Sequence, residues 1–153
     1  MASDYLLVID GIEGESTDDR HKGAIEVDSW SWGASNPSSV GSGGLGSGKV
    51  SVQDLNFTRK VDAASPTLFL RCASGQHIKS AKLFVRKSGG GDEYLTYTFT
   101  DCLVSSFEDK GGGGGEAPTE EIALAFRRIQ MEYRTAAGKV VSAGWDLATN
   151  KKA

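Results

Sequence analysis

The stretch Tyr94-Leu-Thr-Tyr-Thr-Phe-Thr100 decides the fold class, because large apolar side chains alternate in it with threonines. Leu95, Tyr97 and Phe99 fall on one side of an extended chain, and the threonines fall on the other. This period of two is typical of a β-strand with one buried face. The alternation continues to Phe107, so the sequence predicts one long strand here.

The segments on either side repeat the pattern. Upstream, residues 81–86 place Ala81, Leu83 and Val85 on one face. Downstream, residues 121–133 alternate with a fault, because the apolar positions change parity between Ile122, Leu124, Phe126 and Ile129, Met131, Tyr133. A β-bulge near Arg127 and Arg128 would return both sets to a single core face.

A second change of parity lies further upstream, where Ile25 and Val27 give way to Trp30 and Trp32. It predicts a bulge or bend near Asp28. Bent and bulged strands allow a sheet to curl on itself. The C-terminal segment 139–147 is predicted to be a last short strand.

One helix is expected, at about residues 66–74. Ser65 is a candidate N-cap, Pro66 suits the first turn, and Gly75 stands where a left-handed C-cap belongs. The predicted fold is therefore mainly β, a small β-barrel of two antiparallel sheets with one short α-helix.

Length and glycine distribution set the domain organisation. The chain has 153 residues, and 14 of its 20 glycines lie in the stretches 33–48, 89–91 and 111–115. A chain of this length is expected to form a single domain, residues 1–153. The glycine-rich loop at about 33–49 is predicted to be extended, and the tail 150–153 to be short and flexible.

Composition excludes several classes of function. The formal net charge of −3 and the sequence pI near 5.4 argue against a nucleic-acid-binding domain. No apolar run approaches a membrane span, and the N-terminus lacks the pattern of a cleaved signal peptide, so we expect folding in the cytoplasm and no membrane insertion. Cys72 and Cys102 are interpreted as buried, reduced thiols.

The loop 41–49 matches two phosphate-binding patterns. Gly41, Gly43 and Gly46 give G-x-G-x-x-G, while Gly43, Gly48 and Lys49 give G-x-x-x-x-G-K. Both patterns need a helix after the glycines. The following residues alternate as a strand does, so a loop without a nucleotide is favoured and no cofactor is predicted.

Catalytic and metal-binding patterns are missing from the sequence. His21 and His77 lie beside predicted turns, and with two buried cysteines they make a poor metal set. No nucleophile elbow, C-x-x-C or H-E-x-x-H motif occurs. We therefore expect neither an enzyme nor a metal site.

Several segments together resemble the haemolysin-coregulated protein (Hcp) family. They are Glu13-Gly-Glu-Ser16, His21, Ile25-Glu-Val-Asp-Ser-Trp-Ser-Trp-Gly33 and Lys49-Val-Ser-Val-Gln-Asp-Leu-Asn-Phe-Thr58. The likeness continues through 62–75, 81–87, 94–107 and 121–133.

The resemblance implies a structural subunit of the inner tube of the bacterial type VI secretion system. Such subunits form hexameric rings that stack into a tube, are exported to target cells and can carry effectors in the lumen. The implied partners are further copies of the chain, the spike, sheath and baseplate proteins, and effector cargo. The protein would be assembled in the bacterial cytoplasm and then secreted. The alternative is a secreted binding or effector protein that acts alone.

Two sets of site residues follow from combining the alternation with the resemblance. If Trp30 and Trp32 fill the core, Ser29 and Ser31 lie on the opposite face of the strand. The resemblance implies that this face is the wall of the channel, where Ser29 and Ser31 would contact cargo. The loop resembles the family's extended loop, which reaches neighbouring subunits or the next ring. Its candidates for ring assembly are Ser39, Val40, Gly43, Leu45 and Lys49.

Overall fold

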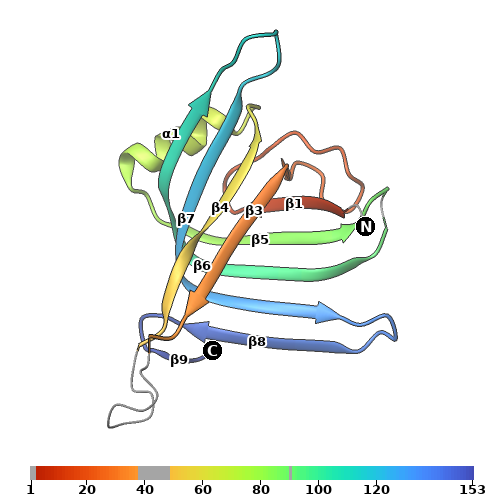
Figure 1. Ribbon diagram of the computed structural model, residues 1–153, viewed down its shortest axis with the longest axis vertical. Coiled ribbons are helices and arrows are strands. Elements are labelled where there is room, and N and C mark those ends of the chain that lie inside the picture. Colours follow the sequence, from red (N-terminus) through yellow and green to blue (C-terminus); the bar gives the residue numbers. More distant parts are fainter. Residues whose placement is uncertain (1–2, 38–48, 90) are drawn as a thin grey trace.

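The computed structural model describes residues 3–37, 49–89 and 91–153 (Figure 1). The elements in chain order are β1 Ser3–Ile9, β2 Ile25–Val27, β3 Ser29–Ser35, β4 Ser51–Lys60, α1 Ser65–Ser74, β5 Ile78–Lys87, β6 Glu93–Lys110, β7 Thr119–Arg134, β8 Val140–Asp146 and β9 Lys151–Lys152. The predicted fold class, mainly β with one short helix, is confirmed. No helix of the described part has the length and apolar composition needed to cross a membrane.

Every strand pair is antiparallel, in the order β2-β1-β5-β6-β7-β4-β3, with β8 beside β7 and β9 beside β8. The long strands β6 and β7 bend and belong to two layers, which cross in Figure 1. Residues 119–124 of β7 pair with β4, whereas 128–134 pair with β8. One layer is therefore β3, β4 and the first half of β7 with the second half of β6. The other holds β1, β2, β5, β8, β9 and the remaining halves of β6 and β7.

The path of strand pairing is open, with β2 at one end and β3 at the other. The two ends are consecutive in the chain and meet at Asp28, whose backbone N–H donates to the Thr58 carbonyl at 2.8 Å. The sheet is folded on itself, but the predicted barrel is not closed by a ladder between β2 and β3. The predicted bend near Asp28 is confirmed, because the chain leaves β1 and joins β4 there.

The core lies between the layers and is filled from the predicted strand faces. Leu83 and Val85 of β5 are buried, as are Tyr97 and Phe99 of β6. Phe99 also packs against Phe126 of β7, with ring centroids 4.9 Å apart. The alternation in the sequence therefore predicts the inward faces of β5 and of β6 up to Phe99 correctly. Beyond Asp101 the prediction is wrong, because the buried positions change to Cys102 and Val104 and Leu103 is 41% exposed.

The change of parity in β7 has a different cause from the one expected. The pairing of β6 with β7 shows no register shift at Arg127 or Arg128, and its shift lies between Val104 and Ser106. The distortion sits across from Arg127, at Asp101, whose φ of 55° is left-handed. The prediction of a bulge at 127–128 is wrong because the partner strand carries the strained backbone.

The helix α1 begins and ends almost where the sequence predicts. Gly75 is its left-handed C-cap, with φ of 67°, but the N-cap is Ala64 rather than Ser65. Asp62 supplies the side-chain hydrogen bond at the start of the helix, since its carboxylate accepts from the Ala64 N–H at 2.8 Å. Leu68 is fully buried and holds the helix to the sheets.

Two boundaries near the glycine-rich loop and the C-terminus differ from expectation. Residues 33–35 belong to β3, so the connecting segment starts later than predicted. The end of the chain is not a frayed tail, because Lys151–Lys152 form β9 against β8. The turn between them is held by Asp146, which accepts backbone hydrogen bonds from Ala148 and Thr149.

Candidate functional site

Strand β3 presents two opposite surfaces. Trp30 and Trp32 are half-buried and pack edge-on against Tyr97, with ring centroids 5.2 and 5.6 Å away. Ser29 and Ser31 are exposed on the other side. The tryptophans and serines therefore lie on opposite faces of β3, as predicted. The packing of Trp30 and Trp32 against Tyr97 holds β3 in place, and the serines form a polar surface on its other face.

The same outward surface continues across the neighbouring strands. Ser29 lies opposite Thr58 of β4, with their hydroxyl oxygens 2.5 Å apart, and Ser31 lies opposite Asn56. Asn56 in turn pairs with Ala123 of β7. Directly opposed residues of antiparallel strands point to the same face. Ala123 is itself buried, so we call the surface formed by Ser29, Ser31, Asn56 and Thr58 the polar wall.

One carboxylate is fixed beside the polar wall. The Ser105 hydroxyl of β6 donates to Asp54 at 2.6 Å and lies 3.2 Å from the Ala123 carbonyl oxygen. The Asn56 side-chain amide donates to the Asp54 backbone carbonyl at 3.2 Å. The wall can thus offer hydroxyl, amide and carboxylate groups, on short side chains, to a molecule lying against it.

Both histidines lie elsewhere and are already engaged. His21 contacts Glu93 and stacks on Phe84 with ring centroids 4.0 Å apart. His77 lies 3.0 Å from an oxygen of Asp101. The serines of the wall therefore have no imidazole beside them to act as a general base.

Sequence reasoning missed a buried ion cluster next to the wall. Arg59 of β4 and Glu120 of β7 are each about 1% exposed and form an ion pair of 2.7 Å. Arg59 also contacts Asp62, just before α1. Parity could have found this pair, because Arg59 follows the core positions Leu55 and Phe57 at spacing two.

The pKa of Glu120 in this cluster is unusually high for a carboxyl group. Burial, reinforced by the neighbouring Asp109 carboxyl, raises the pKa of Glu120 to about 7, against the opposing attraction of Arg59. Charged residues are rarely fully buried unless they are paired. The cluster is a structural joint that connects β4, β7 and the start of α1.

The two cysteines differ in accessibility. Cys102 is buried, and burial raises the pKa of its thiol to about 12, so it is not a nucleophile at neutral pH. Cys72 is half-buried on α1, which is less covered than the sequence suggests.

Ser39, Val40, Gly43 and Leu45 lie outside the described residues. Lys49 is described and is exposed just before β4. Because the element after it is a strand and not a helix, the chain lacks the helix N-terminus that either phosphate-binding pattern requires. Across residues 3–37, 49–89 and 91–153, no three potential metal ligands cluster together.

Comparison with known proteins assigns the family. The family model described as "Type VI secretion system effector, Hcp" matches residues 6–133. Protein hcp1 of Pseudomonas aeruginosa strain PAO1 is 41% identical, over 100% of both chains.

Solved structures agree. The crystal structure of Hcp1 from Salmonella typhimurium is 45% identical, with a TM-score of 0.88 and 100% of both chains covered. A structure described as a type six secretion system protein is 36% identical, with a TM-score of 0.90, and covers 99% of this chain and 100% of its own. The chain therefore belongs to the Hcp family of type VI secretion proteins.

Proposed function

We propose that this protein is a structural subunit of the type VI inner tube. Six copies form a ring, rings stack into a tube, and the tube is exported to the target cell with effectors in its lumen. The polar wall lines that lumen, and Ser29 and Ser31 face the cargo. The protein has no catalytic role of its own in this account, and it binds no cofactor.

The observation that carries the proposal is the chemistry of the polar wall on a chain of this family. Serine, threonine and asparagine side chains form this surface on the face of β3 and β4 opposite Trp30 and Trp32, which pack against Tyr97. Such a surface offers polar groups and few apolar contacts, so it can hold a protein cargo and still release it. Among the described residues of the protomer, Ser29, Ser31 and Asn56 remain exposed.

The remaining assignments complete the assembly. The segment that includes Ser39, Val40, Gly43, Leu45 and Lys49 makes the contact between stacked rings. The spike, sheath and baseplate proteins are the partners at the tip, outer surface and base of the tube. The protein is assembled in the bacterial cytoplasm and leaves it through the secretion apparatus.

Size-exclusion chromatography with light scattering tests the ring. The expected mass is near six times the 16.2 kDa of one chain. A mass of 16.2 kDa that does not change with concentration would instead favour a secreted effector that acts alone.

A further inference from the structure

Two apolar surfaces of the protomer are left uncovered. The first is on α1, where Phe69 is 57% and Leu70 is 60% exposed. The second is on β7 and β8, where Met131, Tyr133 and Val141 are 41%, 43% and 53% exposed. We call the first the helix ridge and the second the apolar shelf. Neighbouring apolar side chains left open in this way mark interaction sites on soluble proteins.

The apolar shelf is an extension of the core. Met131 pairs with Tyr97 and Tyr133 pairs with Leu95, so both point to the inward face of their layer. Tyr133 also pairs with Val141 of β8. The sequence predicts Met131 and Tyr133 as core residues, and their side of the strand agrees. Met131 and Tyr133 are exposed because the layer that contains β3 covers Tyr97 of β6 but does not extend over this part of β7.

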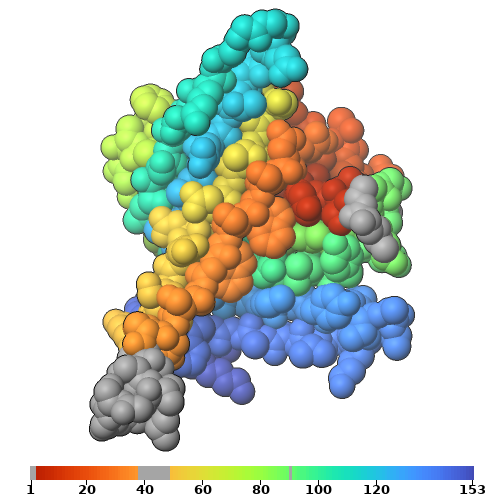
Figure 2. Space-filling model, viewed as in Figure 1, coloured from red at the N-terminus to blue at the C-terminus, as the bar shows by residue number. Residues whose placement is uncertain are grey.

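Figure 2 shows this arrangement directly. The blue surface of β7 and β8 extends beyond the orange β3, with no other element in front of it. A hollow of about 860 Å³ adjoins the shelf, lined by Tyr94, Tyr133, Arg134 and Thr135 among others. The shelf thus borders a recess at Tyr133.

The helix ridge is formed by side chains that point outward from α1. The helix lies outside the sheets, and Phe69 rests on Phe107 of β6 with ring centroids 5.7 Å apart. Leu70 follows it on the outer surface. In Figure 1, α1 lies on the opposite side of the molecule from the open end of β7 and β8.

We infer that the helix ridge of one copy packs into the apolar shelf of the next copy around the ring. The inference rests on the proposed function, because a ring supplies one neighbour on each side. Because the two surfaces lie on opposite sides of the molecule, a single two-fold interface could bury only one of them and would leave the other exposed to water. A head-to-tail contact buries one helix ridge against one apolar shelf at every interface. In a closed ring, both surfaces of every copy are therefore covered.

Complementary charged variants test this contact. Leu70→Glu places an acid on the ridge, and Val141→Lys places a base on the shelf. Each variant alone should shift the mass from near six times 16.2 kDa toward 16.2 kDa. An equimolar mixture should recover rings, because unaltered ridge and shelf contacts then alternate with Glu–Lys contacts.

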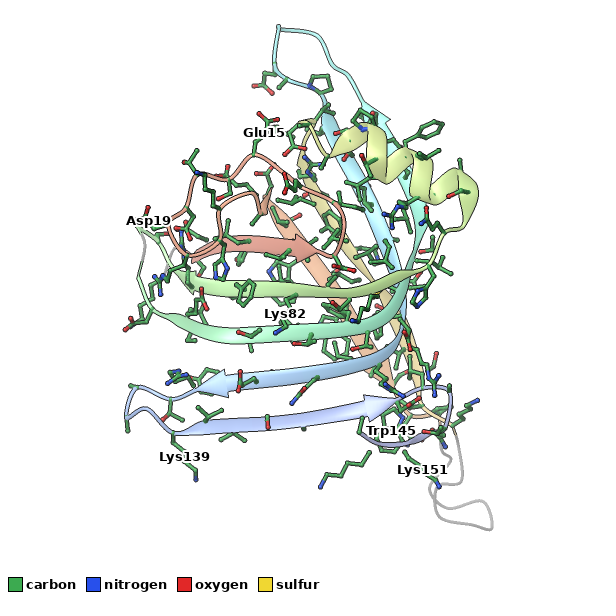
Figure 3. The ribbon with its side chains drawn as sticks, turned by 180° about the vertical axis from the view of Figure 1, so that it is seen from behind. Glu15, Asp19, Lys82, Lys139, Trp145 and Lys151 are labelled. Carbon is green, nitrogen blue, oxygen red and sulfur yellow. The ribbon has the colours of Figure 1, made fainter. Side chains whose placement is uncertain are left out.

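The control is Lys82→Glu. Lys82 is exposed on the outer side of β5, seen from behind in Figure 3, and this change should leave the ring mass unaltered. Thermal unfolding establishes that each variant folds. If a charged variant fails to fold, Leu70→Ser and Val141→Ser replace it, with dissociation expected at low protein concentration.

The outcomes separate the two claims. If the unaltered protein is monomeric, the proposed function fails. If the unaltered protein and both variants form equally stable rings, the tube proposal stands and the ridge and shelf contact is wrong. If both variants dissociate but their mixture does not recover, the two surfaces do not meet each other, and the inference is overturned.

Discussion

Arg59 and Glu120 are the residues on which the stability of the joint between β4 and β7 most depends. Replacing Arg59 by methionine keeps the length of the side chain but leaves Glu120 buried without its cation. Breaking a buried pair from one side typically costs about 3 to 5 kcal/mol. We predict a loss near the lower end of that range at pH 8 and a smaller loss at pH 5.5, where Glu120 is neutral.

Urea unfolding at the two pH values measures both losses. Lys60→Ala, at the exposed neighbouring position, is the matched control and should change stability by no more than about 0.5 kcal/mol. A loss for Arg59→Met that does not depend on pH would contradict the role assigned to Glu120.

The raised pKa of Glu120 predicts a pH dependence of its own. The folded protein holds this proton to about pH 7, whereas the unfolded chain releases it near 4.5. The extra stability is therefore complete below about pH 4.5 and is lost as the pH rises through 7. We predict that Glu120→Gln removes this decline, which is on the order of 3 kcal/mol.

Thermal unfolding of the unaltered protein and of Glu120→Gln between pH 4.5 and 8 measures the difference in stability between them. Other carboxyl groups influence both curves in the same way, so the difference isolates Glu120. Parallel curves for the two proteins would show that Glu120 does not titrate in this range.

At the scale of single elements, the end of α1 depends on one glycine. Gly75 has φ of 67°, and a Cβ there would meet no atom within 4 Å. The cost of Gly75→Ala is therefore backbone strain alone, predicted at about 1 to 2 kcal/mol. Gly113→Ala is the matched control, because Gly113 has open space around it and no left-handed φ.

Denaturant midpoints of the two variants check this prediction. We expect Gly75→Ala to lower the midpoint while Gly113→Ala leaves it unchanged or raises it slightly. Equal effects at both positions would show that the helix end is not held by the left-handed cap.

The elements were predictable from sequence where one physical rule dominates. Alternation gives the inward faces of β5 and of β6 as far as Phe99, and Pro66 and Gly75 bracket the helix. The rule fails where a partner strand decides the outcome. The strained backbone at Asp101 could not be located from β7, because the parity of one strand does not say which of two paired strands is distorted.

Sequence could also predict the side on which a residue lies, but not whether another element reaches it. Met131 and Tyr133 lie on the inward face and remain exposed, because coverage depends on where the second layer ends. Alternation along β3 places Ser29 and Ser31 on the side opposite Trp30 and Trp32, as the sequence predicts. Their neighbours Asn56 and Thr58 required the register of β3 with β4.

At the scale of the whole molecule, the polar wall carries the functional prediction. Ser31→Trp should leave the ring mass unchanged, because Ser31 is exposed and makes no core contact. It should reduce the effector that copurifies by about tenfold, equivalent to about 1.4 kcal/mol of lost binding. Lys82→Trp, on the outer side of β5, is the control and should have no effect.

Quantification of copurified effector by mass spectrometry, normalised to ring mass, checks this prediction. Cargo loading equal to that of the unaltered protein would remove Ser31 from the cargo surface and leave the ring proposal intact.

Electron microscopy of the purified protein tests the central claim most directly, because it reports both the assembly and the orientation of each subunit. The account predicts six-fold rings with an open centre, in which the Ser29 and Ser31 face of β3 and β4 forms the inner surface. Isolated protomers, or rings whose channel is lined by the outer face of β5 and β6, would contradict it.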